Sequence, residues 1–191
     1  MFPIESFQTT VTRFVDILRQ HSIRFHLTGG ITSVAWGEPR MTQDIDVVID
    51  NAAISQSLEP FLNSLQASPF MVDEPSIRKA ISDRGLFQLF DVEECLKLDV
   101  YAREMIPGEL DRSVMTTVFE NVQLPIASRV DSAVSKLVWV SKGSHKNRRD
   151  FRRIYTGASV EEQAAIREFA EQLELAELAD TVLSEPDEIE E

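Results

Sequence analysis

The chain has 191 residues, 43% of them apolar, and a formal net charge of −13. A chain of this length can bury one hydrophobic core, so we expect one domain with at most a small helical addition. It holds no run of about 20 apolar residues, which argues against a membrane-spanning helix. The N-terminus lacks a signal-peptide pattern, and the single cysteine, Cys95, excludes an intramolecular disulfide, so a cytoplasmic location is expected.

The negative charge is concentrated toward the C-terminal end of the chain. Residues 160–191 contain twelve acidic residues and one basic residue, Arg167, which leaves a net charge of −2 on residues 1–159. Within residues 142–153, six Lys and Arg side chains surround one acid, Asp150. Total charge governs solubility and long-range steering, so it does not exclude a local basic patch that binds an anion.

Hydrophobic periodicity and turn residues predict a mixed α/β arrangement up to about residue 127. The expected helices cover residues 5–20, 31–36, 53–66 and 75–83. The expected strands cover residues 24–28, 44–49, 70–72, 86–90, 96–101 and 118–125. Gly29-Gly30 separates the first strand from the second helix, and Gly37-Glu38-Pro39 ends that helix.

From residue 129 onward the pattern becomes helical. Four helices are expected, over residues 129–142, 148–155, 160–171 and 173–183. The sequence therefore predicts an α/β (α+β) fold with a mixed sheet flanked by helices over residues 1–127. A helical region over residues 128–184 would complete a cleft, and the acidic tail 185–191 is predicted to be disordered.

A glycine turn follows the first predicted strand. Thr28 is followed by Gly29 and Gly30, and a helix is expected to start at once. Glycine lets the backbone approach a phosphate closely and take a positive φ, and a helix N-terminus attracts an anion. The pattern therefore indicates a phosphate-binding turn, and a plain tight turn is the alternative.

Two aspartates follow the glycine turn in the pattern Asp-x-Asp. Asp44 and Asp46 lie fourteen and sixteen residues after Gly30, in a strand rich in β-branched residues. Residues i and i+2 of a strand point to one side, so both carboxylates face the same place, unless they are merely solvated at an exposed edge. Magnesium binds carboxylates together with substrate phosphates, and paired metal ions can activate a hydroxyl and stabilise a leaving oxygen. Asp99 stands alone in an apolar strand, where an unpaired carboxylate is costly, so we expect it to complete the site.

The glycine turn, the Asp-Ile-Asp strand and the later strand aspartate resemble the polymerase-β-type nucleotidyltransferase superfamily. More narrowly, GGITSVAW with MTQDIDVVI resembles the AbiEii-type nucleotidyltransferase-like toxins and their relatives. The stretch VDSAVSKLVWVSKGSHKNRRDFRRI resembles that group's helix-borne lysine, basic stretch and Arg-Asp pair, and Lys136 and Asp150 fall on those positions. The resemblance covers roughly residues 23–155 and implies a nucleotidyltransferase-like sheet.

The resemblance also implies a two-metal mechanism. Asp44 and Asp46 would bind Mg²⁺ and a nucleoside triphosphate such as ATP, and Asp99 would join a second Mg²⁺ or act as a base. A nucleoside monophosphate would pass to an acceptor, and pyrophosphate would be released. The implied acceptors are the 3′ end of a tRNA, a protein side chain or a small molecule, and a toxin of this kind implies an antitoxin partner.

The nucleotide-binding residues implied by the resemblance are Thr28, Gly29, Gly30, Lys136 and Asp150. Lys136 would contact the triphosphate, and Asp150 would orient Lys136 or a metal-bound water. The plain structural interpretation makes Lys136 a side chain that extends its amine to water, and Asp150 a surface partner of the neighbouring arginines.

Two other functions are compatible with the same residues. A degenerate relative would keep the fold and act as a binding module through protein contacts, with the acidic helix around residues 168–180 as its surface. A small-molecule modifier, like the aminoglycoside-modifying nucleotidyltransferases, would use the helical half as an acidic pocket for a cationic acceptor. A basic groove near Arg148 would favour RNA instead.

Overall fold

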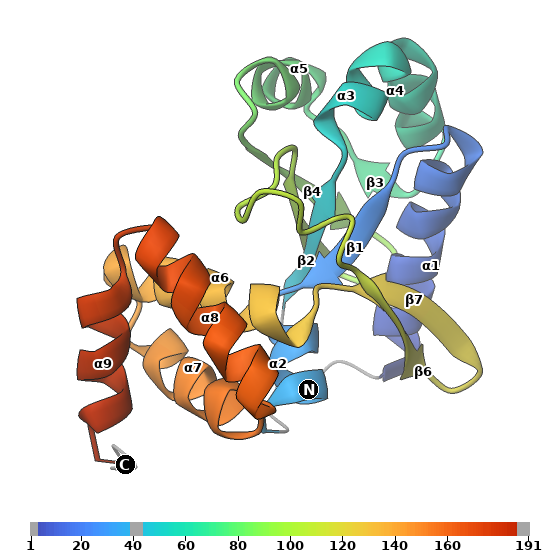
Figure 1. The fold of residues 1–191 in the computed structure, drawn as a ribbon. Helices are drawn as coiled ribbons and strands as arrows, with labels where there is room; N and C mark the ends of the chain where they lie inside the picture. Colours follow the sequence, from blue (N-terminus) through green and yellow to red (C-terminus); the bar gives the residue numbers. More distant parts are fainter. Residues whose placement is uncertain (1–3, 39–43, 187–191) are drawn as a thin grey trace. The chain divides into compact units, whose positions relative to one another are not determined.

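The computed structural model describes residues 4–38 and 44–186 (Figure 1). The chain divides into two compact units, one within Met1–Ile31 and Met41–Ala127, the other within Thr32–Arg40 and Ser128–Glu191. Within the described ranges, no helix has the length and apolar character needed to cross a membrane. The helix predicted over residues 31–36 ends at Trp36, directly before Gly37, as expected. The tail predicted to be disordered lies outside the described residues, apart from Glu185 and Pro186.

All strands of the first unit belong to one seven-stranded sheet in the order β3-β4-β5-β2-β1-β7-β6. The strands are β1 Phe25–Thr28, β2 Asp44–Ile49, β3 Phe70–Met71, β4 Leu86–Asp91, β5 Leu96–Tyr101, β6 Val114–Phe119 and β7 Val122–Ile126. β2 runs parallel to β5 and β1 parallel to β7, whereas the other neighbours are antiparallel. The predicted mixed sheet flanked by helices is confirmed.

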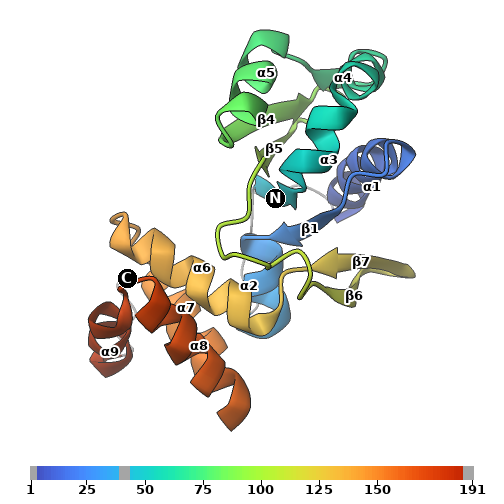
Figure 2. The ribbon, with the colours of Figure 1, turned by 45° about the horizontal axis from the view of Figure 1, so that its top comes forward.

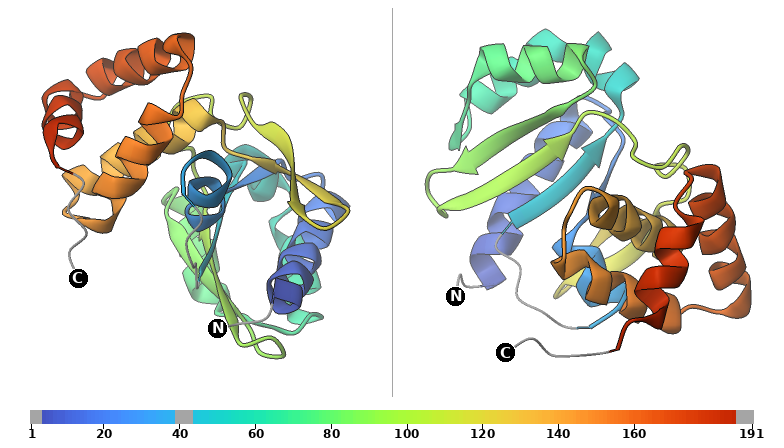
Figure 3. Two further views of the ribbon diagram at one scale, coloured as in Figure 1. Left: turned by 90° about the horizontal axis from the view of Figure 1, so that it is seen from below. Right: turned by 90° about the vertical axis from the view of Figure 1, so that its left-hand side faces the viewer.

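One face of the sheet is covered by α1 (Ile4–Gln20), which lies behind β2, β4 and β5 in the right-hand view of Figure 3. The buried residues of this helix are Thr10, Val11, Phe14, Val15, Ile17 and Leu18. They form a continuous stripe because residues three and four apart share a helix face. Phe14 meets Phe61 and Phe70 edge to face, with ring centroids 6.5 and 6.0 Å apart. Burial of each large apolar side chain contributes about 1.5–3 kcal/mol.

The remaining helices of the first unit are α3 (Asn51–Gln56), α4 (Leu58–Gln66) and α5 (Glu74–Ser82). The single helix predicted over residues 53–66 is wrong, because the chain breaks at Ser57 between α3 and α4. Pro60 explains the break, since a proline ring clashes with the carbonyl four residues earlier and ends a helix there. Asp50 caps the start of α3 by accepting hydrogen bonds from Ala52 and Ala53.

The single strand predicted over residues 118–125 is also wrong. The chain forms a hairpin there, with β6 and β7 joined through Glu120 and Asn121. Asn121 has a φ of 60°, a left-handed conformation that asparagine tolerates better than most residues. The two residues are therefore a turn, and the strand prediction missed β6.

The second unit contains the C-terminal helices, which lie together as one group in Figure 2. They are α6 (Arg129–Ser141), α7 (Lys146–Thr156), α8 (Val160–Gln172) and α9 (Ala176–Ser184). Most of α2 (Gly30–Trp36) belongs to this unit as well, because the division falls after Ile31. Ser128 caps α6, and Ser159 with Glu162 forms a capping box on α8.

A buried carboxylate ties α1 to the end of β4. Asp91 has a fully buried side chain and accepts hydrogen bonds from Thr10 Oγ1 at 3.0 Å and Arg13 Nη1 at 2.9 Å. The backbone N–H groups of Glu93 and Glu94 donate to its Oδ1 at 3.1 and 3.3 Å. Both carboxylate oxygens are therefore engaged, which a buried carboxylate requires.

We expect Asp91→Asn to lower the free energy of unfolding by about 2 kcal/mol or more, because Arg13 loses its buried charged partner, retaining only the exposed Glu93, and one acceptor oxygen becomes a donor. Urea unfolding followed by circular dichroism measures the change. Asp16→Asn is the matched control on α1, since Asp16 is exposed and lies 3.9 Å from Arg19. Equal effects of the two substitutions would contradict the role given to Asp91.

Candidate functional site

Asp44, Asp46 and Asp99 lie on one face of the sheet, on two neighbouring parallel strands. The register pairs Asp46 of β2 directly with Asp99 of β5. Side chains at positions i and i+2 share a strand face, so Asp44 lies on that face as well. Ile45 and Leu98 point to the opposite face and are fully buried in the layer that α1 covers. The carboxylates therefore lie on the face of the sheet that α1 does not cover, which we call the open face. The register of β2 with β5 sets their positions relative to one another.

Gly29 and Asp46 are fitted to each other. β1 pairs with β2 so that Thr28 lies opposite Asp46, and Gly29 follows with a φ of 63°. A Cβ on Gly29 would lie 1.9 Å from Oδ2 of Asp46, well inside any allowed contact. Only glycine satisfies both the left-handed conformation and the close approach. The glycine turn and the Asp-x-Asp strand, recognised separately in the sequence, form one structural unit.

Three further side chains on this face were missed by sequence reasoning. Lys97 Nζ lies 3.0 Å from Oδ2 of Asp99 and 3.5 Å from Oδ1 of Asp44. Gln88 of β4 donates from Nε2 to Oδ1 of Asp99 at 2.8 Å, and the Tyr101 hydroxyl donates to Oδ1 of Asp46 at 3.3 Å. The signal that could have found two of them is alternation along β5, which places Lys97, Asp99 and Tyr101 on one side.

The carboxylates shift the pKa values of their neighbours. Burial raises the pKa of Tyr101, and the charges of Asp46 and Asp99 raise it further, so the phenol stays protonated and donates. Desolvation is the largest influence on the pKa of Lys97 and lowers it, but the hydrogen bond and charge of Asp99, with Asp44, outweigh it. The pKa of Lys97 is therefore raised, and its side chain is a cation at neutral pH.

The face offers the oxygen ligands that a hard divalent ion prefers, but not a closed cage. Across residues 4–38 and 44–186, no three or more His, Cys, Asp and Glu side chains are grouped so that they could hold a metal ion. The Lys97 ammonium lies between Asp44 and Asp99, so the three carboxylates do not converge on one point. Asp44 and Asp46 suit an ion that keeps other oxygen ligands from water or substrate phosphate, as Mg²⁺ usually does.

Lys136 of α6 and Asp150 of α7 form an ion pair inside the second unit. Nζ of Lys136 lies 3.2 Å from Oδ2 of Asp150, and their side chains are only 5% and 11% exposed. The Ser33 hydroxyl on α2 donates to the same carboxylate oxygen at 2.9 Å. Lys136 thus does not extend its amine to water. The pair joins α2, α6 and α7 within this unit.

The basic run on α7 is engaged by two carboxylates of the same unit. The ion pairs are Arg148 and Arg152 with Glu185, and Arg149 and Arg153 with Glu38. Arg152 Nη1 lies 2.9 Å from Glu185, and Arg149 Nη2 lies 2.8 Å from Glu38. These ion pairs connect α7 to the end of α9 and to the end of α2, so the basic run stabilises the packing of helices within this unit.

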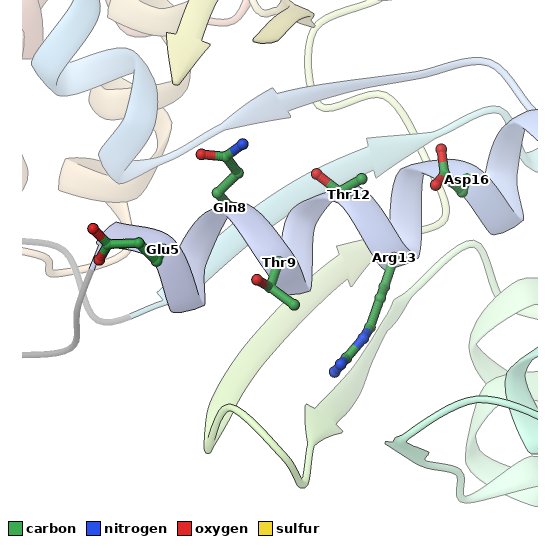
Figure 4. A pocket seen from close by; sticks show the side chains of 6 residues that line it. All are labelled: Glu5, Gln8, Thr9, Thr12, Arg13 and Asp16. Atoms are coloured by element: carbon green, nitrogen blue, oxygen red, sulfur yellow. The ribbon is translucent and has the colours of Figure 1, made fainter. Parts of the chain in front are cut away.

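The first unit holds two other features, a depression along α1 and a buried histidine on β1. A shallow depression runs along α1 and is lined by six residues of that helix: Glu5, Gln8, Thr9, Thr12, Arg13 and Asp16 (Figure 4). Because α1 covers the apolar face of the sheet, this depression is not part of the carboxylate face. His26 lies 2.9 Å from the Ser113 hydroxyl and 3.7 Å from Glu109, and the side chains of His26 and Glu109 are buried.

Comparison with known proteins identifies a family for the chain. Residues 15–186 match the family described as "Nucleotidyl transferase AbiEii toxin, Type IV TA system". No curated protein matches the sequence.

The chain also aligns with solved structures at low sequence identity. The solution structure of the antibiotic-resistance factor ANT(2'')-Ia aligns with a TM-score of 0.60 and 15% identity, over 95% of this chain and 98% of that chain. The crystal structure of an antigenic nucleotidyltransferase-like protein from Paracoccidioides brasiliensis aligns with a TM-score of 0.48 and 16% identity, over 93% of both chains. At 15% identity the first likeness shows the fold alone, whereas the family match spans most of the sequence. The chain belongs to the AbiEii nucleotidyltransferase toxin family of type IV toxin–antitoxin systems.

Proposed function

We propose that the chain transfers a nucleoside monophosphate from a nucleoside triphosphate to an acceptor hydroxyl, with Mg²⁺ bound by Asp44 and Asp46. The observation that carries the proposal is the register of β2 and β5, which places Asp46 beside Asp99 on an open sheet face. A carboxylate cluster next to a glycine turn supplies both a place for the ion and room for a phosphate. The family match supports the same reaction class.

The residues on the carboxylate face have distinct parts in the proposed reaction. Bound Mg²⁺ would neutralise charge on the triphosphate. Tyr101 orients Asp46 through its hydrogen bond, and Gly29 leaves space beside that carboxylate. Asp99 accepts the proton of the acceptor hydroxyl while the hydroxyl oxygen of the acceptor forms a bond to the α-phosphorus. The bond from that phosphorus to the bridging oxygen breaks, and pyrophosphate leaves.

We further propose that Thr28, Gly29 and Gly30 bind the nucleotide and that Lys136 contacts the triphosphate, positioned by Asp150. A buried ion pair is a weak source of stability, because desolvation offsets much of its attraction. The burial of Lys136 beside Asp150 therefore supports a role beyond joining α6 to α7.

The acceptor and the partner are proposed at the level of class. The family description supports an antitoxin partner. Because four arginines of the basic run pair with Glu38 and Glu185, the run does not by itself select RNA over a protein or small-molecule acceptor. The assay must therefore offer total tRNA, a protein extract and aminoglycosides in separate reactions with each labelled nucleoside triphosphate.

We expect Asp44→Asn and Asp46→Asn each to reduce Mg²⁺-dependent transfer by about 100-fold or more, because each removes a charged ligand of the ion. Label incorporation and pyrophosphate release measure the loss. Asp83→Asn, at an exposed carboxylate of the same unit, is the control and should keep full activity. Undiminished transfer in both site variants rules the proposal out. Thermal stabilisation by nucleotide with Mg²⁺, without transfer to any acceptor, identifies a binding module instead.

Substitution of Gly29 by alanine tests the fit between the turn and Asp46. Gly29→Ala and Gly143→Ala both force alanine into a positive φ, at a cost of about 1 kcal/mol each. A Cβ at Gly143, whose φ is 93°, meets no atom within 4 Å, so it is the matched control. We expect only Gly29→Ala to abolish transfer, since its Cβ displaces the Asp46 carboxylate. Equal transfer rates in the two variants, measured well below their melting temperatures, would refute the fit.

A further inference from the structure

The Lys97 side chain occupies the space between two of the three carboxylates. Its Nζ lies 3.0 Å from Asp99 and 3.5 Å from Asp44, and both are on the open face of the sheet. Three carboxylates gathered on one face repel one another, and a cation between them relieves that repulsion. The chain therefore supplies one cation of its own to the place where the family resemblance implies a metal ion.

The two carboxylates beside Lys97 differ in their exposure and in their distance from its ammonium group. Asp99 is 13% exposed, and both of its oxygens are engaged, Oδ1 by Gln88 and Oδ2 by Lys97. Ligation of a metal would require Asp99 to give up these bonds. Asp44 is 46% exposed and lies 3.5 Å from Lys97 Nζ, so it is the more accessible of the two to an ion on the face that it shares with Asp46.

We propose that Lys97 takes the place of a second divalent cation, so that the site binds one divalent ion, on Asp44 and Asp46. One such ion and the Lys97 ammonium together balance the charges of the three carboxylates. Lys97 is then a positioning residue, because its ion pair with Asp99 fixes the carboxylate that accepts the proton of the acceptor hydroxyl. This inference rests on the proposed function for the identity of the metal site, and it replaces the two ions implied by the resemblance.

The test counts Mn²⁺ ions bound to the full chain without nucleotide, by the loss of the free Mn²⁺ signal in electron paramagnetic resonance. Salt near 0.15 M screens weak binding to the acidic surface. We expect one ion per wild-type chain and two per Lys97→Met chain, because removal of the ammonium frees Asp99 and Asp44 as ligands. Lys97→Gln should also give two, and Lys97→Arg should give one.

Two controls separate the local effect from overall charge. Lys79→Met removes an exposed lysine of α5 and should leave one ion bound. Asp99→Asn should leave one ion in the wild-type background and should return the Lys97→Met chain from two ions to one.

Two ions on the wild-type chain, with no change in Lys97→Met, would overturn the inference and leave the proposed transfer intact. Binding of no ion to either chain would also overturn it, and label transfer would then decide the proposed function separately. Full Mn²⁺ binding in Asp44→Asn and Asp46→Asn chains would place the ion elsewhere and contradict both.

Discussion

Three like charges held on one sheet face are the constraint around which the first unit is built. The parallel register of β2 and β5 brings Asp46 beside Asp99, and the strand alternation adds Asp44. Their repulsion is offset locally by Lys97 and by hydrogen bonds from Gln88 and Tyr101. The remaining repulsion is offset by apolar burial on the opposite face of the sheet, where alternate residues of the same strands lie under α1.

The sequence predicted which way the aspartates of β2 point but not which side chains of other strands they contact. Alternation along β2 correctly placed Asp44 and Asp46 on one face and Ile45 and Val47 on the other, and the predicted α/β class was confirmed. The pairing of β2 with β5 joins segments fifty residues apart, and no local pattern specifies it. The contact of Lys97 with Asp44 depends on that pairing, whereas the contact of Gln88 with Asp99 depends on the register of β4 with β5, and neither contact was predicted.

The errors in the fold prediction have local causes that propensity alone underweights. Pro60 lies near the start of α4, where it suits a first turn but prevents α3 from continuing through it. Asn121 supplies the left-handed residue of the β6–β7 turn, a role more often signalled by glycine. Burial of Lys136 did not follow from the local sequence either, because its partner Asp150 lies on a different helix and only the family resemblance implied their pairing.

The most direct measurement of the central claim is a crystal structure of the chain with Mn²⁺ and a non-hydrolysable nucleoside triphosphate. Anomalous scattering locates the ion independently of the protein chain. The account predicts an ion about 2 Å from oxygens of Asp44 and Asp46, with the triphosphate beside Gly29. Nucleotide bound with its ion on other residues, or turned toward the apolar face of the sheet, would contradict it.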